Sequence, residues 1–577
     1  MLNYNQANNS FDYVTKNQVS IKGDCPFFKV KCLKKTLEEE EDPFQVVIEY
    51  QDGVNHGEFT MPTKILGSLA NLVTYFNQQG VMIKDYHKHD VNNILINQIR
   101  KSPLQYQHKT LGWKEVDGQW YYLQQTAQIG NYISTCTRNF DFTAGSQSEY
   151  EKMLKKVVYP SKELTLAYMI GFSAVVSSWL EKQNLADLGT IVLNINGRSS
   201  SGKSTVEQLL LSPFGNPVFK KTGLGVTHSG TLNGIIDALG GINGMPRVID
   251  DLTQNTQINI TELIYTIAQK ETKKRCGKDW NNIAEGWSGL VVISSEEPIL
   301  DSCRSGGLYG RVLFADNIQW TKTAEEAETI KAVVQKNYGF KGADFAKFIQ
   351  SKGMDELSTL LTKHRQDLLS RIELQDAFTA RISNKLAVIS MTVDLFKECF
   401  QAPFQWTAIE LLEPLVTAER VFAIERDPVK QVLDILWRYF ESYRNKRFDI
   451  KYSNDEVYPA QQRHDGSVFY QDLGNTSKVL ICIDTKVMKS LMSEHGFNQW
   501  KTAADILKKK GWLLGEKNRK GEIVRNDKCV NGTRCFCFLL DNKINPYEES
   551  SIMDDGLAAQ NQDSSLKTST PERRKVL

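Results

Sequence analysis

The residues with the clearest chemical signature form a segment rich in glycine and serine, about one third of the way along the chain. It reads Gly197-Arg198-Ser199-Ser200-Ser201-Gly202-Lys203-Ser204, is followed by Thr205, and fits the pattern GxxxxGK[ST] in full. The glycines let backbone N–H groups converge on phosphate oxygens, and a following helix adds the positive end of its dipole. We expect Lys203 to reach the β- and γ-phosphates of ATP and the Ser204 hydroxyl to bind Mg²⁺.

A magnesium ion at such a loop also needs a carboxylate at the end of a neighbouring strand. The segment PRVIDD supplies two candidates, Asp250 and Asp251. Asp250 is the expected metal ligand. Asp251 occupies the position from which a longer glutamate would polarise the attacking water, so the shorter aspartate makes this role less direct. The alternative is an exposed acidic turn that happens to follow a strand.

Two further features are placed to sense the nucleotide. A predicted strand over residues 289–294 (GLVVIS) ends at Ser294 and Ser295, and either hydroxyl could touch the γ-phosphate or the water. Both serines could equally do no more than end the strand. Arg381, on a helix predicted over residues 377–396, could contact a nucleotide as a second sensor, which rests on its position alone.

An arginine that follows a short turn is a candidate for a finger that crosses a subunit boundary. Arg311 stands in GLYGRVLF, just before a predicted strand, and Arg304 is a rival for the same role. A finger stabilises the charge that develops on the transferred phosphoryl group. A structural ion pair is the alternative for Arg311.

Basic side chains gather beside an aromatic residue between the carboxylates and the sensor strand. They are Lys270, Lys273, Lys274, Arg275 and Lys278, with Trp280. Charges that contact phosphates and a ring that stacks on bases suit a single strand of DNA. The alternative is a basic loop that is simply solvated.

The elements that would position these residues follow from the hydrophobic pattern. An almost wholly apolar helix is predicted over residues 164–180, and buried strands over 190–195, 247–249 and 289–294. Apolar strands separated by helices indicate a parallel α/β sheet. Residues 1–150 suggest a small α+β domain, and residues 324–425 are almost all helical by periodicity.

The C-terminal part predicts a different module. Two helices over residues 484–495 and 498–510 precede strands over 511–514 and 534–540, the order of a winged helix. An excess of Lys and Arg over residues 501–528 favours phosphate contact, although winged helices also bind proteins. Cys529, Cys535 and Cys537 lie close together but lack a fourth zinc ligand.

Composition limits the class of protein. A chain of 577 residues exceeds the roughly 250–300 residues of one core. With 41% hydrophobic and 24% charged residues it is an ordinary globular mixture, and no apolar run approaches the roughly 18 residues of a membrane span. The net charge of +2 predicts no partner, so a nucleic-acid surface must be local. Ten cysteines, scattered except for Cys529, Cys535 and Cys537, fit a reducing cytoplasm, and we expect no secretory signal.

Taken in order, these motifs resemble an AAA+ ATPase. Over roughly residues 150–540 the chain is similar to the MCM-like, self-loading replicative helicases of staphylococcal pathogenicity islands and cassette elements. GLYGRVLF corresponds to the Ser-Arg-Phe-Asp finger motif of that group, but with Gly310 and Val312 on either side of the arginine. The loop with Lys273 to Lys278 matches, by place, a hairpin that lines the DNA channel.

The resemblance implies a multidomain α/β protein. Its expected parts are an N-terminal α+β domain (1–150), a P-loop AAA+ core (151–323), a helical lid (324–425), a winged helix (426–545) and a disordered tail (546–577). It further implies a homo-hexameric ring that uses ATP and Mg²⁺ to translocate on single-stranded DNA, from 3′ to 5′. Such a ring would unwind forked DNA during replication of a mobile element.

Two other functions remain open at this point. One is a DNA-binding replication initiator that uses ATP only as an assembly switch. The other is a small-molecule kinase, which would need neither the basic loop nor the finger. Sustained ATP turnover stimulated by single-stranded DNA favours the motor over the switch, and a six-fold ring excludes the kinase.

Overall fold

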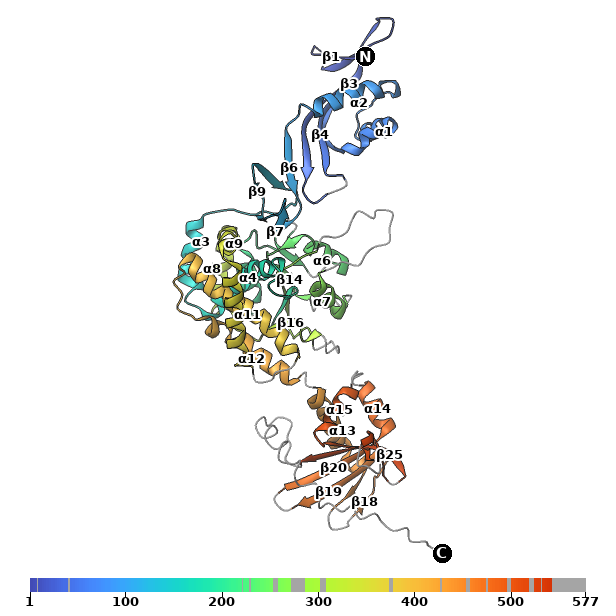
Figure 1. The fold of residues 1–577 in the computed structure, drawn as a ribbon, viewed down its shortest axis with the longest axis vertical. Coiled ribbons are helices and arrows are strands. Elements are labelled where there is room, and N and C mark those ends of the chain that lie inside the picture. The colour runs from blue at the N-terminus through green and yellow to red at the C-terminus, as the bar shows by residue number, and fades with distance from the viewer. Residues whose placement is uncertain are drawn as a thin grey trace. The chain divides into compact units, whose positions relative to one another are not determined.

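The computed structural model describes residues 1–577 except residues 8, 40–41, 221, 228–229, 253–257, 271–285, 301–307, 373–376, 426–427, 453–456, 474–475, 495–499, 518–522, 531 and 542–577. The chain divides into two compact units, Met1–Glu419 and Arg420–Leu577 (Figure 1). The basic side chains from Lys273 to Lys278, Arg304 and the tail over residues 546–577 lie outside the described residues.

The first unit begins with a mainly antiparallel sheet and two helices. Its elements are β1 (Leu2–Asn5), β2 (Ser10–Val14), β3 (Ser20–Thr36), β4 (Phe44–Asp52), β5 (Asn55–Pro62), α1 (Leu69–Gln78), α2 (Lys88–Ile99), β6 (Leu104–His108), β7 (Leu111–Val116), β8 (Gln119–Leu123), β9 (Thr126–Ile129) and β10 (Tyr132–Cys136). A 3₁₀ turn over Thr63–Gly67 precedes α1, and the Ser68 side chain caps α1 by accepting a hydrogen bond from the Asn71 amide.

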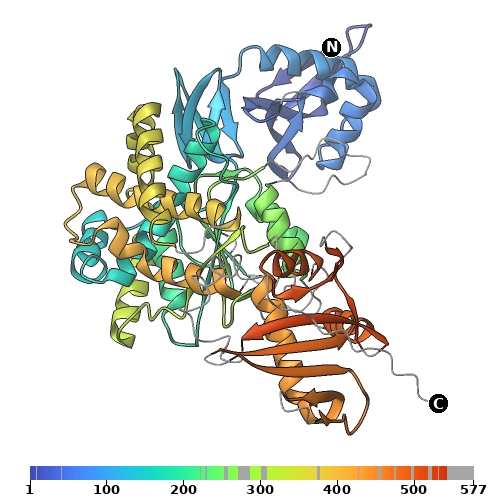
Figure 2. The same ribbon diagram turned by 60° about the horizontal axis from the view of Figure 1, so that its bottom comes forward.

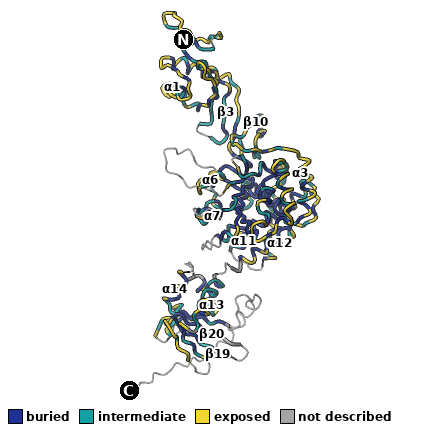
Figure 3. The backbone as a smooth tube through the Cα atoms, turned by 180° about the vertical axis from the view of Figure 1, so that it is seen from behind, coloured by how far each residue is buried: buried dark blue, intermediate teal, exposed yellow. Residues whose placement is uncertain are grey.

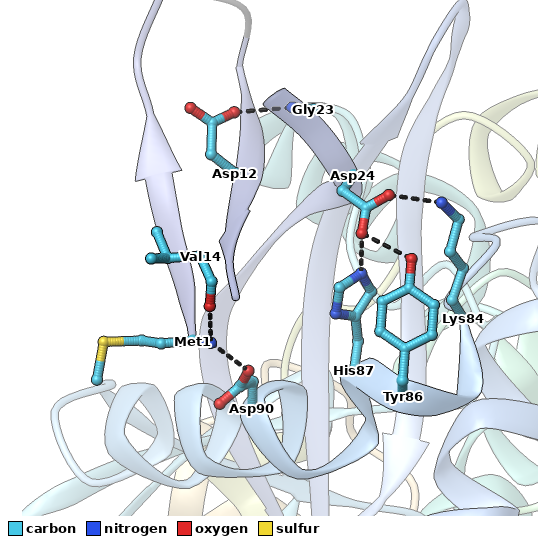
Figure 4. Close-up of polar contacts among 9 residues, drawn as sticks. All are labelled: Met1, Asp12, Val14, Gly23, Asp24, Lys84, Tyr86, His87 and Asp90. Atoms are coloured by element: carbon cyan, nitrogen blue, oxygen red, sulfur yellow. Dashed lines mark hydrogen bonds and ion pairs between the residues drawn. The ribbon is translucent and has the colours of Figure 1, made fainter. Parts of the chain in front are cut away.

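A buried carboxylate joins β3 to the turn before α2 (Figure 4). Asp24 accepts hydrogen bonds from Lys84 (2.5 Å) and Tyr86 (2.8 Å), and lies 2.8 Å from Nε2 of His87. Burial acts to raise the pKa of Asp24, but these three partners outweigh it and hold the pKa below its usual value. The cluster therefore fixes the turn against the sheet.

The centre of the first unit is a five-stranded parallel sheet in the order β12-β14-β15-β11-β16. The strands are β12 (Gly225–Thr227), β14 (Arg247–Asp250), β15 (Leu290–Ser295), β11 (Ile191–Asn196) and β16 (Val312–Asp316). Helices α5 (Lys203–Leu211), α6 (Leu232–Leu239) and α7 (Ile260–Gln269) lie between them in sequence, and the short β13 (Ile242–Asn243) pairs with β7. The parallel α/β sheet predicted from the apolar strands is confirmed.

Helices enclose this sheet and share its core. They are α3 (Gln147–Met153), α4 (Lys162–Lys182), α8 (Ala324–Val334), α9 (Gly342–Ser351), α10 (Met354–Leu369), α11 (Ala377–Phe400) and α12 (Ala408–Glu425). One cluster of buried side chains extends from Leu111 to Val416, and Figure 3 shows buried residues gathered around α11. Packing therefore crosses the boundaries predicted at residues 150 and 323, which stay predictions.

Helix α4 is the only described helix that is long and apolar enough to span a membrane. Of its most apolar window, 94% is buried inside the protein. A helix buried on all sides is apolar all round, which explains why its sequence shows no polar face. It serves as a central core helix, as predicted over residues 164–180.

The second unit combines helices with a mainly antiparallel sheet, in which β17 and β19 pair in parallel. It contains α13 (Pro428–Arg447), β17 (Phe448–Lys451), β18 (Val457–Tyr458), β19 (Gly466–Leu473), β20 (Thr476–Asp484), α14 (Thr485–Glu494), α15 (Trp500–Lys509), β21 (Leu513–Leu514), β22 (Glu516–Lys517), β23 (Ile523–Arg525), β24 (Lys528–Val530) and β25 (Thr533–Asp541). Figure 2 shows its long strands side by side, in orange and red. The predicted helix, helix, strand, strand order is present, within a sheet of seven strands.

Candidate nucleotide site

The segment from Gly197 to Gly202 forms a loop between the buried strand β11 and helix α5. Gly202 has a left-handed φ of +92° and precedes the first residue of α5. A Cβ atom at Gly202 would lie 2.7 Å from Oγ1 of Thr321 and 3.0 Å from its backbone nitrogen, so a larger residue does not fit. The loop therefore brings backbone N–H groups to the N-terminus of a helix, where an anion binds.

Lys203 lies across the mouth of this loop. Its Nζ donates hydrogen bonds to the carbonyl oxygens of Gly197 (2.5 Å) and Arg198 (3.2 Å). The ammonium group is thus held where phosphate oxygens would replace the carbonyls. Ser204, one residue further on, is exposed in the first turn of α5, whereas Thr205 is buried.

The carboxylates and the sensor serine meet at the ends of neighbouring strands. Ser294 donates a hydrogen bond to Oδ1 of Asp250 (3.3 Å) and accepts one from the backbone amide of Asp251 (2.9 Å). Strand β15, which carries Ser294, lies between β14 and β11, so Ser294 stands between the carboxylates and the phosphate loop. Asp251 has a φ of +47°, which turns the chain away directly after β14.

The two sensor candidates differ in what they contact. The Ser295 hydroxyl is fully buried and accepts a hydrogen bond from Nδ2 of Asn194 (2.8 Å) on β11. Because successive side chains of a strand point to opposite faces, only Ser294 faces Asp250. The structure thus joins Ser294, and not Ser295, to the two aspartates.

A third carboxylate, which the sequence pattern did not single out, lies beneath this site. Glu207 is fully buried on α5, and neither of its oxygens forms a hydrogen bond within the described part of the chain. Burial raises the pKa of Glu207 to about 8, and the charge on Asp250 adds to this, while Ser294 and Lys203 act in the opposite direction. The sequence feature that could have pointed to Glu207 is a single acidic residue beside Val206, Leu209 and Leu210, which are buried on the same helix.

The arginines proposed to act on a nucleotide lie together at the other edge of the sheet. The Arg311 guanidinium lies 4.6 Å from the ring centre of Tyr265, and Lys385 donates a hydrogen bond of 2.5 Å to the Arg311 carbonyl. A Cβ at Gly310 would lie 3.7 Å from Cδ of Arg381, which brings the two predicted arginines together. Burial lowers the pKa of Lys385 to about 7, and the charges of Arg311 and Arg381 lower it further.

The register of the sheet gives the distance between these cations and the phosphate loop of the same chain. Asp316 at the end of β16 pairs with Asn196, next to the phosphate loop, whereas Arg311 precedes the first residue of β16. The five residue steps from Arg311 to Asp316 span roughly 16 Å at about 3.3 Å per step. Arg311 therefore lies too far along the strand to touch a phosphate in its own loop.

A cavity of about 320 Å³ opens beside the phosphate loop. It is lined by Lys156, Val157, Pro160, Ser161, Lys322, Thr323, Glu325, Glu326 and Thr329. The loop and the cavity are adjacent because Thr321, which contacts Gly202, precedes the lining residue Lys322. Its volume lies at the lower end of the roughly 300–1,000 Å³ of small-molecule sites.

Comparison with known proteins places this arrangement in a known fold. A family model described as "Domain of unknown function (DUF927)" matches residues 28–282. No curated protein matches the chain. The solved structure described as "SCCmec type IV Cch - active helicase" is similar with a TM-score of 0.71 and 19% sequence identity, over 94% of this chain and 97% of that one. The chain thus shares the fold of that helicase along nearly its whole length.

Proposed function

We propose that the protein is an ATP-driven DNA helicase with an AAA+ core, of the MCM-like type found on staphylococcal mobile elements. The observation that carries this is the hydrogen-bonded set of Ser294, Asp250 and Asp251 beside the phosphate loop of a five-stranded parallel sheet. The fold shared with a protein described as an active helicase supports the same function.

The residues at the strand ends suit a magnesium ion. Asp250 offers a carboxylate and Ser204 an exposed hydroxyl, and the buried carboxyl group of Glu207, which is largely protonated without a ligand, would ionise more readily beside a bound cation. Bound Mg²⁺ neutralises charge on the β- and γ-phosphates during transfer. Lys203 moves from the loop carbonyls to those phosphates, Ser294 holds Asp250 in place, and Asp251 orients the attacking water.

The cavity beside the loop is our candidate for the nucleoside end of ATP. It begins at Lys322, one residue after the Thr321 that lies beside Gly202, and is bounded by the first turn of α8 on one side and residues 156–161 on the other. A ligand that fills both places would have its phosphates at Gly202 and its base against Val157 and Pro160. This arrangement uses the described cavity without moving any element.

The position of the cations at the far edge of the sheet supports our proposal of a ring. Arg311 and Arg381 lie beyond the reach of their own phosphate loop, so a nucleotide can use them only when a second subunit presents its loop to them. We propose that Arg311 is a finger that acts in trans and that Arg381 assists it. Six subunits closed into a homo-hexamer would place one such pair at every interface.

The proposed DNA partners are single-stranded and forked DNA, with translocation from 3′ to 5′. Lys273, Lys274, Arg275 and Lys278 remain the proposed grip on the strand, because they directly precede the sensor strand β15 in sequence. Hydrolysis sensed at Ser294 would then move this loop. The second unit, proposed as a winged helix, adds basic residues for phosphate contact.

ATP turnover in the presence of single-stranded DNA tests this function. Wild-type protein is expected to hydrolyse ATP in a manner that needs Mg²⁺ and increases with single-stranded DNA, while Lys203→Ala abolishes turnover. Particle mass measured with ATP should correspond to six subunits. ATP-dependent assembly without sustained turnover would instead identify an ATP-switched initiator, and turnover by a monomer that ignores DNA would refute the proposal.

A further inference from the structure

Three tyrosines form a row on the sheet of the second unit. Tyr452 follows β17 directly, Tyr458 ends the edge strand β18, and Tyr470 lies on β19. The rings of Tyr452 and Tyr470 are stacked, with centres 5.1 Å apart and planes at 12°, and Tyr458 stands at 89° to Tyr452 with centres 5.7 Å apart. The row therefore presents ring faces and edges from three neighbouring strands.

Strand register places all three rings on one face. Ile450 pairs with Tyr458 on one side and with Val468 on the other. Tyr452 and Tyr470 each lie two residues beyond that pair, and side chains two residues apart share a face of a sheet. Ile450 and Val468 are buried against the core, so the row continues the core face outward.

Exposure distinguishes this row from ordinary core aromatics. Phe440 and Phe448 of the same unit are 1% and 0% exposed, whereas Tyr452 is 38% and Tyr458 is 54% exposed. Two large rings thus remain in solvent next to a partly buried third. Exposed aromatic rings arranged in a row are suited to a ligand with flat apolar faces.

Cations border the row. The Arg444 guanidinium lies 5.2 Å from the ring centre of Tyr470, and the last turn of α13 carries Arg444, Lys446 and Arg447. Burial raises the pKa of Tyr470, the charge of Arg444 lowers it, and the charge of Glu441 on the same helix raises it. Rings beside basic groups are the combination by which proteins bind single strands: bases stack while phosphates contact the cations.

We infer that Tyr452, Tyr458 and Tyr470, with Arg444, form a binding site for single-stranded DNA. A duplex hides the faces of its bases, so the site selects a strand that is already open. The choice of DNA as the nucleic acid rests on the proposed function. Binding itself requires no ATP, because every residue of the site lies in the second unit.

The test measures the affinity of the full chain, without ATP, for fluorescent oligo(dT) longer than the roughly 16 nucleotides that such sites span at most. Tyr452→Ala with Tyr458→Ala should weaken binding at least about fivefold for each base that stacks, with an unchanged salt dependence. The double Tyr→Phe variant keeps the rings and should bind like wild type. Tyr4→Ala, which removes a tyrosine 51% exposed in the first unit, is the control.

A second variant tests how much the positive charge beside the row contributes to DNA binding. Arg444→Gln should make the slope of log affinity against log salt shallower by about 0.7, the value for one phosphate contact on a single strand. Equal losses for oligo(dT) and a hairpin duplex, or wild-type affinity of the double alanine variant, would overturn the inference. Because the binding assay contains no ATP, its result can be interpreted even if the protein has no helicase activity. Conversely, normal binding by the double alanine variant would refute this site without contradicting the proposed ATPase.

Discussion

Replacing Glu207 with glutamine is expected to stabilise the nucleotide-free protein, and more so at higher pH. In the folded state the pKa of Glu207 is about 8, against 4.5 for an exposed glutamate. Between these two values the unfolded chain releases the proton while the folded chain keeps it, so folding stability falls as the pH rises. Above about pH 8 both states are ionised and the loss is complete. Glutamine has a similar shape, carries no charge and avoids this loss.

Linkage gives the size of the effect. At 1.36 kcal/mol for each pH unit, the cost of the carboxyl group is about 1 kcal/mol at pH 5 and about 4 kcal/mol at pH 8. Glu207→Gln should therefore gain about 3 kcal/mol more free energy of unfolding at pH 8 than at pH 5. Urea titrations followed by tryptophan fluorescence measure this difference. Glu328→Gln removes an exposed carboxylate on α8 and serves as the matched control.

The same gain at both pH values, or a loss at pH 8, would refute the reasoning. Either result would mean that Glu207 has a partner or reaches solvent. Because the buried Glu207 destabilises the fold, we expect it to have a role in ATP hydrolysis, through its neighbours Asp250 and Ser294. Glu207→Gln should therefore bind ATP yet hydrolyse it more slowly, as stability is gained where function is lost.

Three further predictions concern the cations. Arg311→Ala should bind ATP but turn it over roughly 10³–10⁵ times more slowly. Mixing this variant with Lys203→Ala should restore part of the activity, because some interfaces then combine an intact loop with an intact finger. Mixed rings that recover no activity would indicate a structural role for Arg311. Lys385→Met should slow ATP turnover, since Lys385 donates a hydrogen bond to the Arg311 carbonyl. The variant should not melt at a lower temperature at pH 7, because a lysine whose pKa is lowered to about 7 costs stability below pH 10.5, and most below pH 7. An unchanged turnover rate would show that Lys385 does not act through Arg311. Neutralising Lys273, Lys274 and Lys278 should make the slope of log affinity for single-stranded DNA against log salt shallower by about 2. The variant should lose the stimulation of ATP turnover by DNA and retain basal hydrolysis. Normal stimulation by DNA would assign the loop to the solvated surface.

The phosphate loop was predictable from sequence because its chemistry is local. Gly197 and Gly202 provide backbone conformations that few other residues adopt, and Lys203 follows at a fixed distance along the same turn. The flanking strand and helix were equally predictable from continuous apolar runs. Each of these features depends on residues that are near neighbours in the chain.

Features that depend on tertiary packing could not be predicted in this way. Ser294 and Ser295 are equivalent in sequence, and only the register of β14 with β15, which pairs Ile249 with Ile293, decides which hydroxyl meets Asp250. Glu207 looks like a solvated helix residue until burial of α5 is known. Lys385 meets Arg311 across 74 residues of chain, a contact that no spacing rule reveals.

Strand displacement on a forked DNA duplex tests the central claim most directly. Wild-type protein with ATP and Mg²⁺ should separate the strands, while neither a non-hydrolysable analogue nor the Lys203→Ala variant should support separation. A fork with only a 3′ single-stranded arm should be unwound, and one with only a 5′ arm should not. Binding to the fork with ATP turnover but no strand separation, under conditions in which six-subunit particles form, would contradict the account.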